Sequence, residues 1–352
     1  MNLTYLESVV SRRRDPYHIY SVRKRDSSSR RRIAAPHDEI RTVQRWILDN
    51  VLADIPVHPA AFAYVKNRSA PECARQHLGA SWIVKLDIQN FFHHYDEVQV
   101  YGALAPYGYS PLVRLEIARI ATRHPLGVQR WLPAKYWKST RQRDENEDVS
   151  STGEDLLSSL FDSPSFTEQE TWLPYDQGER LGYLPQGSPA SGAIANLLSR
   201  GLDESLSTVA ASYSLTYTRY ADDITLSASG PFNRRTAESA LYDALRAVAR
   251  AGLFPNRRKC KIVKPGTPLE ILGVRIDGDV AHLSKRVRNR LEFHLRGVEK
   301  FGIAGHAAHT GFADGLGLSH HIHGLIRYAH DVDPTAAAAY FESFERLFPV
   351  DL

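Results

Sequence analysis

One short run, Arg-Tyr-Ala-Asp-Asp-Ile-Thr-Leu at residues 219–226, constrains the fold more than any other part of this chain. Residues 215–220 and 224–228, at its two ends, have the alternating or continuous apolar pattern of β-strands. Asp222 and Asp223 lie between them, and Asp tolerates the backbone angles of a turn. The run therefore predicts a β-hairpin with two carboxylates exposed at its tip, where they suit Mg²⁺ or Mn²⁺. An ordinary hairpin with acidic turn residues is the alternative interpretation.

A second acidic strand end strengthens the metal interpretation. Residues 81–86 form an apolar, β-rich run that ends on Asp87 and leads into a pair of phenylalanines. Two-metal phosphoryl transfer requires carboxylates from different strands to hold two cations roughly 3.5 to 4 Å apart. We therefore expect Asp87 to converge with Asp222 and Asp223 on a shared metal site.

Three segments together resemble the A, B and C motifs of reverse transcriptases, in particular the bacterial retron-type branch. They are residues 87–92, the run Leu-Pro-Gln-Gly-Ser-Pro-Ala-Ser at 184–191, and Tyr-Ala-Asp-Asp at 220–223. Their order and spacing agree with that family, and the similarity extends from about Tyr20 to the last predicted helix. The resemblance implies an α+β fold of the right-hand polymerase type, with fingers, a palm built on an antiparallel sheet, and a helical thumb.

The resemblance also implies three domains. Residues 1–80 are expected to form the fingers with an N-terminal basic hairpin, and residues 81–265 the palm. Residues 266–352 are expected to form a primer-grip hairpin and the helical thumb. Within the palm, residues 138–180 are polar and rich in acidic side chains, which indicates a surface insertion.

Local sequence signals predict the individual elements. N-cap residues, Pro at the first helical position and closing Gly residues indicate helices over residues 38–52, 111–122, 188–211, 233–250, 285–300, 318–330 and 334–347. A basic hairpin with a Ser-rich turn is predicted at residues 20–33, and a further strand at 260–263. The segment 269–276, followed by a turn at Asp277-Gly278, is predicted to be the primer-grip hairpin.

By resemblance, four residues bind metal in this chain: Asp87, Ile88, Asp222 and Asp223. The implied cofactor is a pair of Mg²⁺ ions, with Mn²⁺ as a substitute. The basic run at 256–259 resembles the family's D motif, whose lysine can protonate the leaving pyrophosphate. Lys259 is the predicted residue for that role, and Lys261 is its rival.

The resemblance assigns nucleotide binding to Lys24, Arg31, Phe92, Gln186 and Gly187. Arginine suits phosphate because its planar guanidinium group donates two parallel hydrogen bonds. The family's triphosphate-contacting arginine corresponds to Arg31 or, with a shift of one position, to Arg30 or Arg32. Phe92 occupies the sugar-gate position, where a bulky ring would collide with a ribose 2′-hydroxyl. The implied primer-grip residues are Leu272 and Gly273.

Composition agrees with a nucleic-acid partner and excludes several other classes. The formal charge is +4 and the pI near 8.9, with basic residues concentrated in residues 12–45 and 285–296. The two cysteines, Cys73 and Cys260, favour a reducing compartment without a disulfide framework. No apolar run reaches about 18 residues, so a membrane span is not expected and the cytoplasm is the predicted location.

The predicted function is RNA-directed DNA synthesis in a retron or related anti-phage defence system. The implied partners are a structured noncoding RNA as template and primer, the RNA/DNA hybrid, deoxynucleoside triphosphates and an effector protein. Gly192 stands where the family commonly has Pro, the family's Asn-Ala-x-x-His element is missing, and residues 270–273 replace the customary Val-Thr-Gly. The alternatives are untemplated or protein-primed synthesis, a mobile-intron enzyme, RNA-templated RNA synthesis, and a catalytically silent RNA-binding scaffold.

Overall fold

The computed structural model describes residues 2–23, 30–124 and 181–348, so Lys24 and the predicted insertion at 138–180 lie outside the described residues. By its internal contacts the chain forms two compact units, each discontinuous in sequence. The first unit comprises Met1–Val65, Ile88–Leu206 and Tyr242–Asn256, and the second comprises Lys66–Asp87, Ser207–Leu241 and Arg257–Leu352. The division into three domains stays a prediction.

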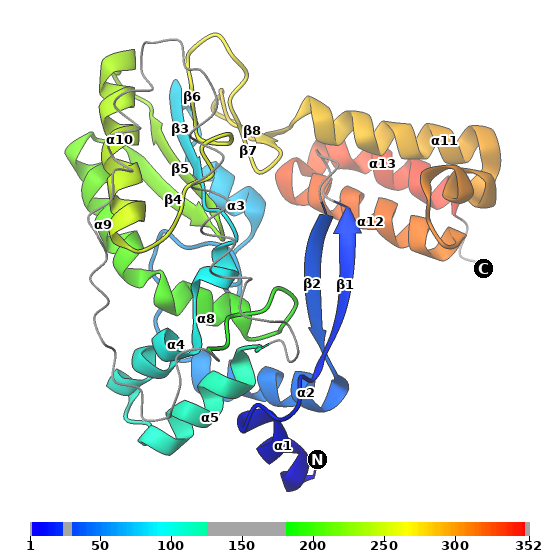
Figure 1. Cartoon of the computed structure of the whole chain (residues 1–352). Helices are drawn as coiled ribbons and strands as arrows, with labels where there is room; N and C mark the ends of the chain where they lie inside the picture. The colour runs from blue at the N-terminus through cyan, green and yellow to red at the C-terminus, as the bar shows by residue number, and fades with distance from the viewer. Residues whose placement is uncertain (1, 24–29, 125–180, 349–352) are drawn as a thin grey trace, which may run out of the picture. The chain divides into compact units, whose positions relative to one another are not determined.

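A two-stranded hairpin begins the first unit after a short helix, α1 (Leu3–Val10). Strand β1 (Tyr17–Arg23) pairs antiparallel with β2 (Arg30–Pro36) along its full length, which confirms the predicted basic hairpin (Figure 1). Helix α2 (Asp38–Ile47) follows and continues as a π-helical turn, Leu48–Leu52, so this predicted helix is confirmed in extent.

Among its described residues, the first unit also contains helices α4 (Glu97–Ala103), α5 (Pro111–Ala121) and α8 (Ser191–Leu198). Short 3₁₀ turns at Phe91–His94 and Ala105–Tyr107 flank α4. Helix α5 begins as predicted, with Ser110 as N-cap and Pro at the first helical position.

One buried carboxylate connects several of these elements. Glu97 is 1% exposed and forms an ion pair with Arg12, while its Oε2 atom also accepts the N–H of Gly182 at 3.1 Å. Because a buried charge without a partner would be costly, the Arg12 guanidinium stabilises the folded state. The chain that follows α1 is thereby attached to α4.

Two helices span both units. Helix α9 (Arg200–Ser212) follows α8 after a break at Ser199, so the single helix predicted over 188–211 is wrong. The Ser199 hydroxyl donates to the Ala195 carbonyl at 2.7 Å, and such back-bonding bends a helix. Helix α10 (Arg234–Arg250) starts and ends as predicted, with Asn233 as its N-cap.

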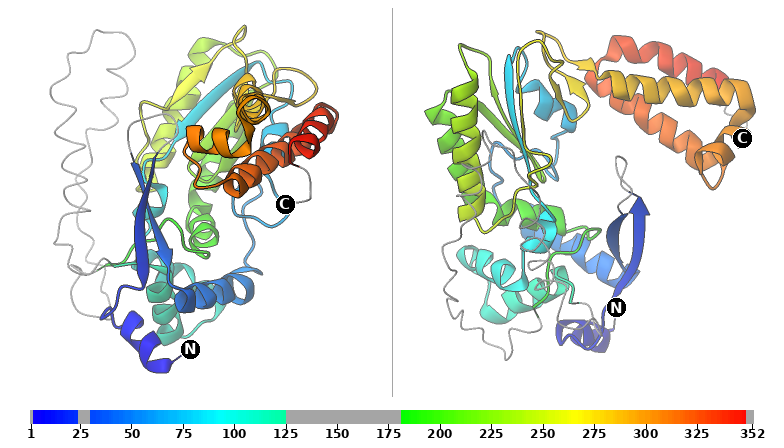
Figure 2. Two further views of the ribbon diagram at one scale, coloured as in Figure 1. Left: turned by 90° about the vertical axis from the view of Figure 1, so that its right-hand side faces the viewer. Right: turned by 45° about the horizontal axis from the view of Figure 1, so that its top comes forward.

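The second unit contains a four-stranded antiparallel sheet in the order β4-β5-β3-β6 (Figure 2). Its strands are β3 (Trp82–Asp87), β4 (Thr216–Tyr220), β5 (Asp223–Ala228) and β6 (Lys261–Val263). Side chains alternate between its faces, so Val84 and Leu86 are buried on one face and Lys85 and Asp87 lie on the other. With a short helix, α3 (Ala70–Arg75), beside β4, this arrangement confirms the α+β class.

A smaller sheet and three helices complete the second unit. Strands β7 (Glu270–Ile271), β8 (Val274–Arg275) and β9 (His282–Leu283) lead into α11 (Lys285–Thr310), α12 (Gly315–Val332) and α13 (Pro334–Leu347). The three helices run side by side (Figure 1), and their shared core includes the fully buried Leu291, Leu318, Ile322, Ile326 and Ala329.

The first of these helices differs from its prediction. It was expected to end at Lys300, but α11 turns at Gly302 and resumes as far as Thr310. Gly302 has φ 71° and ψ 167°, a conformation that Gly adopts easily because it has no Cβ. Helix α12 likewise begins at Gly315, three residues earlier than predicted.

Within the three described stretches of the chain, no helix has the length and apolar character needed to cross a membrane.

Candidate active site

The two central strands of the sheet bring two predicted metal ligands together. Asp87 is the last residue of β3 and Asp223 the first of β5, and the two are direct partners in the antiparallel pairing. Directly opposed residues have Cβ atoms about 4.5 to 5.5 Å apart and point to the same face. Asp87 is 5% exposed, whereas Asp223 keeps an exposed surface. The predicted convergence of acids from separate strands is therefore present between these two.

The hairpin tip lies one residue earlier than predicted. Tyr220 pairs with Asp223, so the two tip residues are Ala221 and Asp222, and Asp223 belongs to strand β5. The prediction of Asp222 and Asp223 as the exposed turn pair is wrong, because pairing with β3 extends β5 by one residue. Asp222 is only partly exposed, and Ala221 is buried.

This tip is locally strained and held by a neighbour. Ala221 has φ 57°, in the left-handed region that a residue with a Cβ adopts only at a cost of about 1 kcal/mol or more. The fully buried Arg219 donates from its guanidinium group to the Ala221 carbonyl at 3.3 Å. A side chain from the same strand thus fixes the backbone beside Asp222.

Negative charge is crowded at this end of the sheet. Burial of its surroundings, followed by the charges of Asp222 and Asp87, raises the pKa of Asp223 to about 6. The positive charges of Lys85 and Lys259 act in the opposite direction. A divalent cation would relieve this repulsion, and carboxylate oxygen is the ligand that Mg²⁺ prefers.

Lys259 contacts the carboxylates directly. Its ammonium group donates to Oδ2 of Asp87 at 2.6 Å. Burial lowers the pKa of Lys259, but the hydrogen bond and the charge of Asp87 outweigh it, so the pKa is raised overall. In the part of the chain that the structure describes, no group of three or more His, Cys, Asp or Glu converges as a metal site.

Sequence reasoning missed Lys85. It lies two residues before Asp87, and strand alternation would have placed both on the same face. The largely buried Lys85 side chain donates to the backbone carbonyl of Glu270, in the hairpin that follows the sheet. Burial, followed by the charge of Lys261, lowers the pKa of Lys85. The partner that makes Lys85 notable is 185 residues away in sequence, so no local signal identifies the contact.

The predicted primer-grip residues form a hairpin tip of their own. Leu272 and Gly273 join β7 to β8 with φ values of 52° and 90°. The chain reverses a second time between β8 and β9, over the segment that contains the predicted turn at Asp277-Gly278. Tyr328 donates to the Leu272 carbonyl at 2.7 Å. A Cβ on Gly273 would lie 3.0 Å from Val287, so the position favours Gly for space as well as for its angles.

Four predicted nucleotide-binding residues, Arg31, Phe92, Gln186 and Gly187, belong to the first unit. The N–H of Ala34 in β2 donates to the Gln186 carbonyl at 2.8 Å. Gly187 has φ 126°, and a Cβ there would lie 2.7 Å from the Ala34 carbonyl oxygen. The strand that carries the exposed Arg31 is therefore packed against the Gln186-Gly187 segment, as only Gly at this position permits.

Phe92 is accompanied by an aromatic residue that the motifs did not indicate. Its ring lies 5.8 Å from that of Tyr64, which is 54% exposed and has φ 60°. A Cβ on Gly192 would lie only 2.3 Å from the Tyr64 ring, so Gly in place of the family's Pro leaves room for this ring. The side chain of Asn196 donates to the Ala63 carbonyl at 2.7 Å and holds the preceding residue in place.

A four-stranded antiparallel sheet with acidic residues at the adjoining ends of its central strands is the palm arrangement of right-hand polymerases, the fold class predicted above. Residues 165–276 match the family described as "Reverse transcriptase (RNA-dependent DNA polymerase)". This match includes Asp222, Asp223 and Lys259, while Asp87 lies before it.

Curated proteins of similar sequence are also reverse transcriptases. The chain is 28% identical to the retron Mx162 reverse transcriptase of Myxococcus xanthus over 94% of its own length and 61% of the relative's. It is 28% identical to retron Mx65 reverse transcriptase of the same species, over 91% and 62%, and 26% identical to retron Ec86 reverse transcriptase of Escherichia coli, over 74% and 63%. These matches agree with the predicted resemblance: residues 165–276 match a reverse-transcriptase family model, and the chain is similar to retron-type enzymes over most of its length. It spans just over six tenths of the length of each of these three relatives.

Solved structures give weaker likenesses. Telomerase from Candida albicans has a TM-score of 0.42 and 12% identity, covering 98% of this chain and 58% of that one. The foamy viral protease-reverse transcriptase has a TM-score of 0.39 and 12% identity, covering 94% and 42%.

Proposed function

We propose that this chain is an RNA-directed DNA polymerase that extends a primer by two-metal phosphoryl transfer. The observation that carries the proposal is the pairing of Asp87 with Asp223 on one face of the sheet, with Asp222 in the adjoining turn. The similarity to retron reverse transcriptases supports it. Intact carboxylates at both strand ends argue against a catalytically silent scaffold.

The residues fit a divalent metal, because hard carboxylate oxygens are concentrated where burial, followed by their mutual repulsion, raises the pKa of Asp223. Asp87, Ile88, Asp222 and Asp223 would hold two Mg²⁺ ions, or Mn²⁺ in their place. Bound ions would lower the pKa of the primer 3′-hydroxyl and neutralise charge on the triphosphate. Lys259, whose ammonium group donates to Asp87, would give a proton to the leaving pyrophosphate.

Nucleotide and primer binding are proposed for the residues that the family resemblance assigns. Phe92, supported by the Tyr64 ring, excludes a ribose 2′-hydroxyl and so favours deoxynucleotides. Lys24 and Arg31 bind the triphosphate, and the Gln186-Gly187 segment packs on the new base pair. Leu272 and Gly273 bind the primer backbone.

The biological setting proposed is a retron or related anti-phage defence system in the cytoplasm. Its components would be a structured noncoding RNA that is both template and primer, the RNA/DNA hybrid and an effector protein. The support is the similarity to enzymes named as retron reverse transcriptases. Sequencing of the nucleic acid that copurifies with the full chain tests this setting, since a single discrete RNA joined to DNA is the expected product.

Primer extension tests the activity itself. The full chain is incubated with a primed RNA template and either deoxy- or ribonucleotides, with Mg²⁺ or with chelator. DNA synthesis that requires Mg²⁺ and fails in the Asp87→Asn variant is the expected result. Glu238→Gln, an exposed acid on α10, is the matched control and should retain full activity. Normal synthesis by a folded Asp87→Asn protein would refute the assignment.

A further inference from the structure

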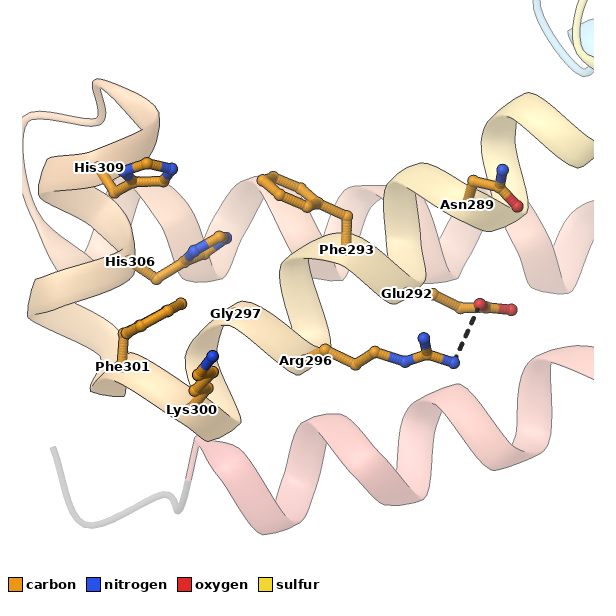
Figure 3. Close-up of a pocket in the computed structure, with 9 residues that line it drawn as sticks. All are labelled: Asn289, Glu292, Phe293, Arg296, Gly297, Lys300, Phe301, His306 and His309. Carbon is orange, nitrogen blue, oxygen red and sulfur yellow. Dashed lines mark hydrogen bonds and ion pairs between the residues drawn. The ribbon is translucent and has the colours of Figure 1, made fainter.

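A pocket of about 510 Å³ lies in α11, where the helix turns at Gly302 and its two segments meet (Figure 3). The lining residues come from both segments, Asn289 to Phe301 before the turn and His306 to His309 after it. None of them is among the predicted catalytic, nucleotide-binding or primer-grip residues. The polymerase proposal therefore leaves this pocket without a role.

A buried histidine, His306, forms the floor of the pocket. His306 is 1% exposed, and among the described residues its Nδ1 atom has no hydrogen-bond partner. Its Nε2 atom lies 3.1 Å from Nδ1 of His294. Because Nδ1 is buried and this edge of the His306 ring packs against Gly297, the histidine shapes the pocket floor and Nδ1 is not open to a ligand.

The position of His306 depends on a glycine. A Cβ on Gly297 would lie 2.2 Å from the His306 ring, closer than atoms can approach. Figure 3 shows His306 pointing from the second segment back toward Gly297 and Phe293 of the first. The Phe293 and His306 ring centroids are 5.2 Å apart in an edge-to-face arrangement. The pocket floor is therefore fixed by packing from both segments.

The rim of the pocket combines aromatic rings with cations. Phe293 and Phe301 are 51% and 58% exposed, which is unusual for large apolar side chains. The Lys300 ammonium group lies 5.1 Å from the centre of the Phe301 ring. Arg296 is exposed and forms an ion pair with Glu292 at 3.5 Å. Exposed aromatic rings beside cations are the usual means by which proteins bind unpaired nucleotides.

A polar and basic stripe leads along the helix to this rim. Residues at spacings of three and four lie on the same face of a helix, and here they are Lys285, Asn289, Phe293, Arg296 and Lys300. All five are exposed. A phosphate backbone lying along the stripe would meet cations at both ends and arrive at the two phenylalanine rings.

We propose that this pocket receives one unpaired nucleotide of a nucleic-acid strand. Its base stacks on the exposed phenylalanine rings above the His306 floor, while Lys300 and Arg296 bind the flanking phosphates. The site serves to anchor nucleic acid and takes no part in the chemistry. It therefore does not depend on the polymerase proposal, and it is tested without divalent metal.

Photo-crosslinking with the full chain tests the site directly. The probes are short single strands that contain one 4-thiouridine, as RNA, or one 4-thiothymidine, as DNA, and adducts are mapped by mass spectrometry. We expect an adduct within residues 289–309. Phe301→Ala and Lys300→Glu, both at exposed positions, should each reduce it by about fivefold or more, because base stacking on an aromatic ring contributes at least that much. Trp46→Ala, at an exposed aromatic of the first unit, should leave it unchanged.

A matched pair of glycine variants tests the floor. Gly297→Ala would displace His306 and should abolish the adduct. On Gly305 a Cβ meets only the Cβ of Phe301, at 3.5 Å, so Gly305→Ala should preserve it. Circular dichroism shows whether each variant is folded. The proposal is overturned if neither probe forms an adduct in this segment, or if the adduct persists in folded Phe301→Ala and Gly297→Ala proteins.

Discussion

The hairpins β4-β5 and β7-β8, both in the second unit, have the same two-residue loop but carry different chemistry. In β4-β5 only the first tip residue, Ala221, has a positive φ, and an acid follows it. In β7-β8 both tip residues, Leu272 and Gly273, have positive φ, and neither is charged. A turn of the second kind suits hairpins well but normally requires small or polar residues at both positions.

In both hairpins a side-chain hydrogen bond holds the strained tip residue in place. Each hairpin has a non-glycine residue in the left-handed region, and each of those residues accepts a hydrogen bond at its own carbonyl. The donor is Arg219 for Ala221 and Tyr328 for Leu272. In the first hairpin the fixed tip presents a carboxylate, and in the second it presents backbone. Lys85 connects the two, since it lies on the β3 strand and donates to the β7 carbonyl of Glu270.

The largest effect is expected from removing the tip charge of the first hairpin. If Asp222 holds metal as proposed, Asp222→Asn should lower the rate of primer extension on the order of 10³-fold, because losing a metal ligand costs several kcal/mol of transition-state stabilisation. Asp277→Asn, which follows the second hairpin and loses its ion pair with Arg275, should change the rate little. Steady-state kinetics of the two variants measures the contrast. Equal losses in both would show that the tips do not differ in role.

Acid should weaken the first hairpin through a buried histidine. His77 lies 2.7 Å from the hydroxyls of Thr218 in β4 and Ser227 in β5, and burial, followed by the charge of Lys85, lowers its pKa from 6.5 to about 4. The unfolded chain therefore binds the proton first as pH falls, and the free energy of unfolding should decrease between pH 6.5 and 4. The full contribution of this one shift is about 3 kcal/mol.

Denaturant titrations at several pH values measure that slope. The variant His77→Gln cannot titrate, so its slope should be shallower than that of the parent protein. His93 and His294 also have pKa values lowered to about 4, mainly by burial, and they contribute to the slope that remains. Burial lowers the pKa of His94 and His306 as well, whereas the raised pKa of Asp223 opposes the slope. Identical slopes in the parent and the variant would rule out His77 as the source.

Removing the Tyr328 hydroxyl should destabilise the second hairpin. Tyr328→Phe leaves the Leu272 carbonyl without this hydrogen bond, which should lower the free energy of unfolding by about 1 kcal/mol. If the tip binds the primer as proposed, the KM for primer–template should rise while kcat stays the same. Tyr107→Phe, at an exposed position in the first unit, is the control. A fall in kcat with unchanged KM would contradict the primer-grip role.

The two hairpins and several helix starts could be predicted from the sequence, because these features depend on local signals. The acidic pair, the basic hairpin of the first unit and the N-cap residues Ser110 and Asn233 were identified in this way. The register at Asp223 was not, because pairing with Asp87, far away in sequence, decides where β5 begins. The continuation of α11 beyond Gly302 was missed because a glycine near a helix end normally indicates a stop.

The residues that sequence reasoning missed have distant partners. Lys85 is notable because of Glu270, and Tyr64 because of Phe92 and Gly192. Their own neighbours in sequence give no sign of these contacts. A glycine where the family commonly has Pro was the one available hint, and the structure explains it by the space that the Tyr64 ring occupies.

The smallest effect is expected from relaxing the first tip. Ala221→Gly removes a Cβ from a residue with φ 57°, and relief of that strain exceeds the entropy that glycine loses on folding. The free energy of unfolding should rise by about 0.5 kcal/mol. Ala228→Gly, in strand β5 of the same hairpin and in extended backbone, should instead lower it by about the same amount. If the variant Ala221→Gly is more stable but extends primers more slowly, the strain at this tip serves to orient Asp222. If it is more stable and equally active, the donor Arg219 alone is sufficient to orient the carboxylate, and the left-handed alanine has no catalytic purpose.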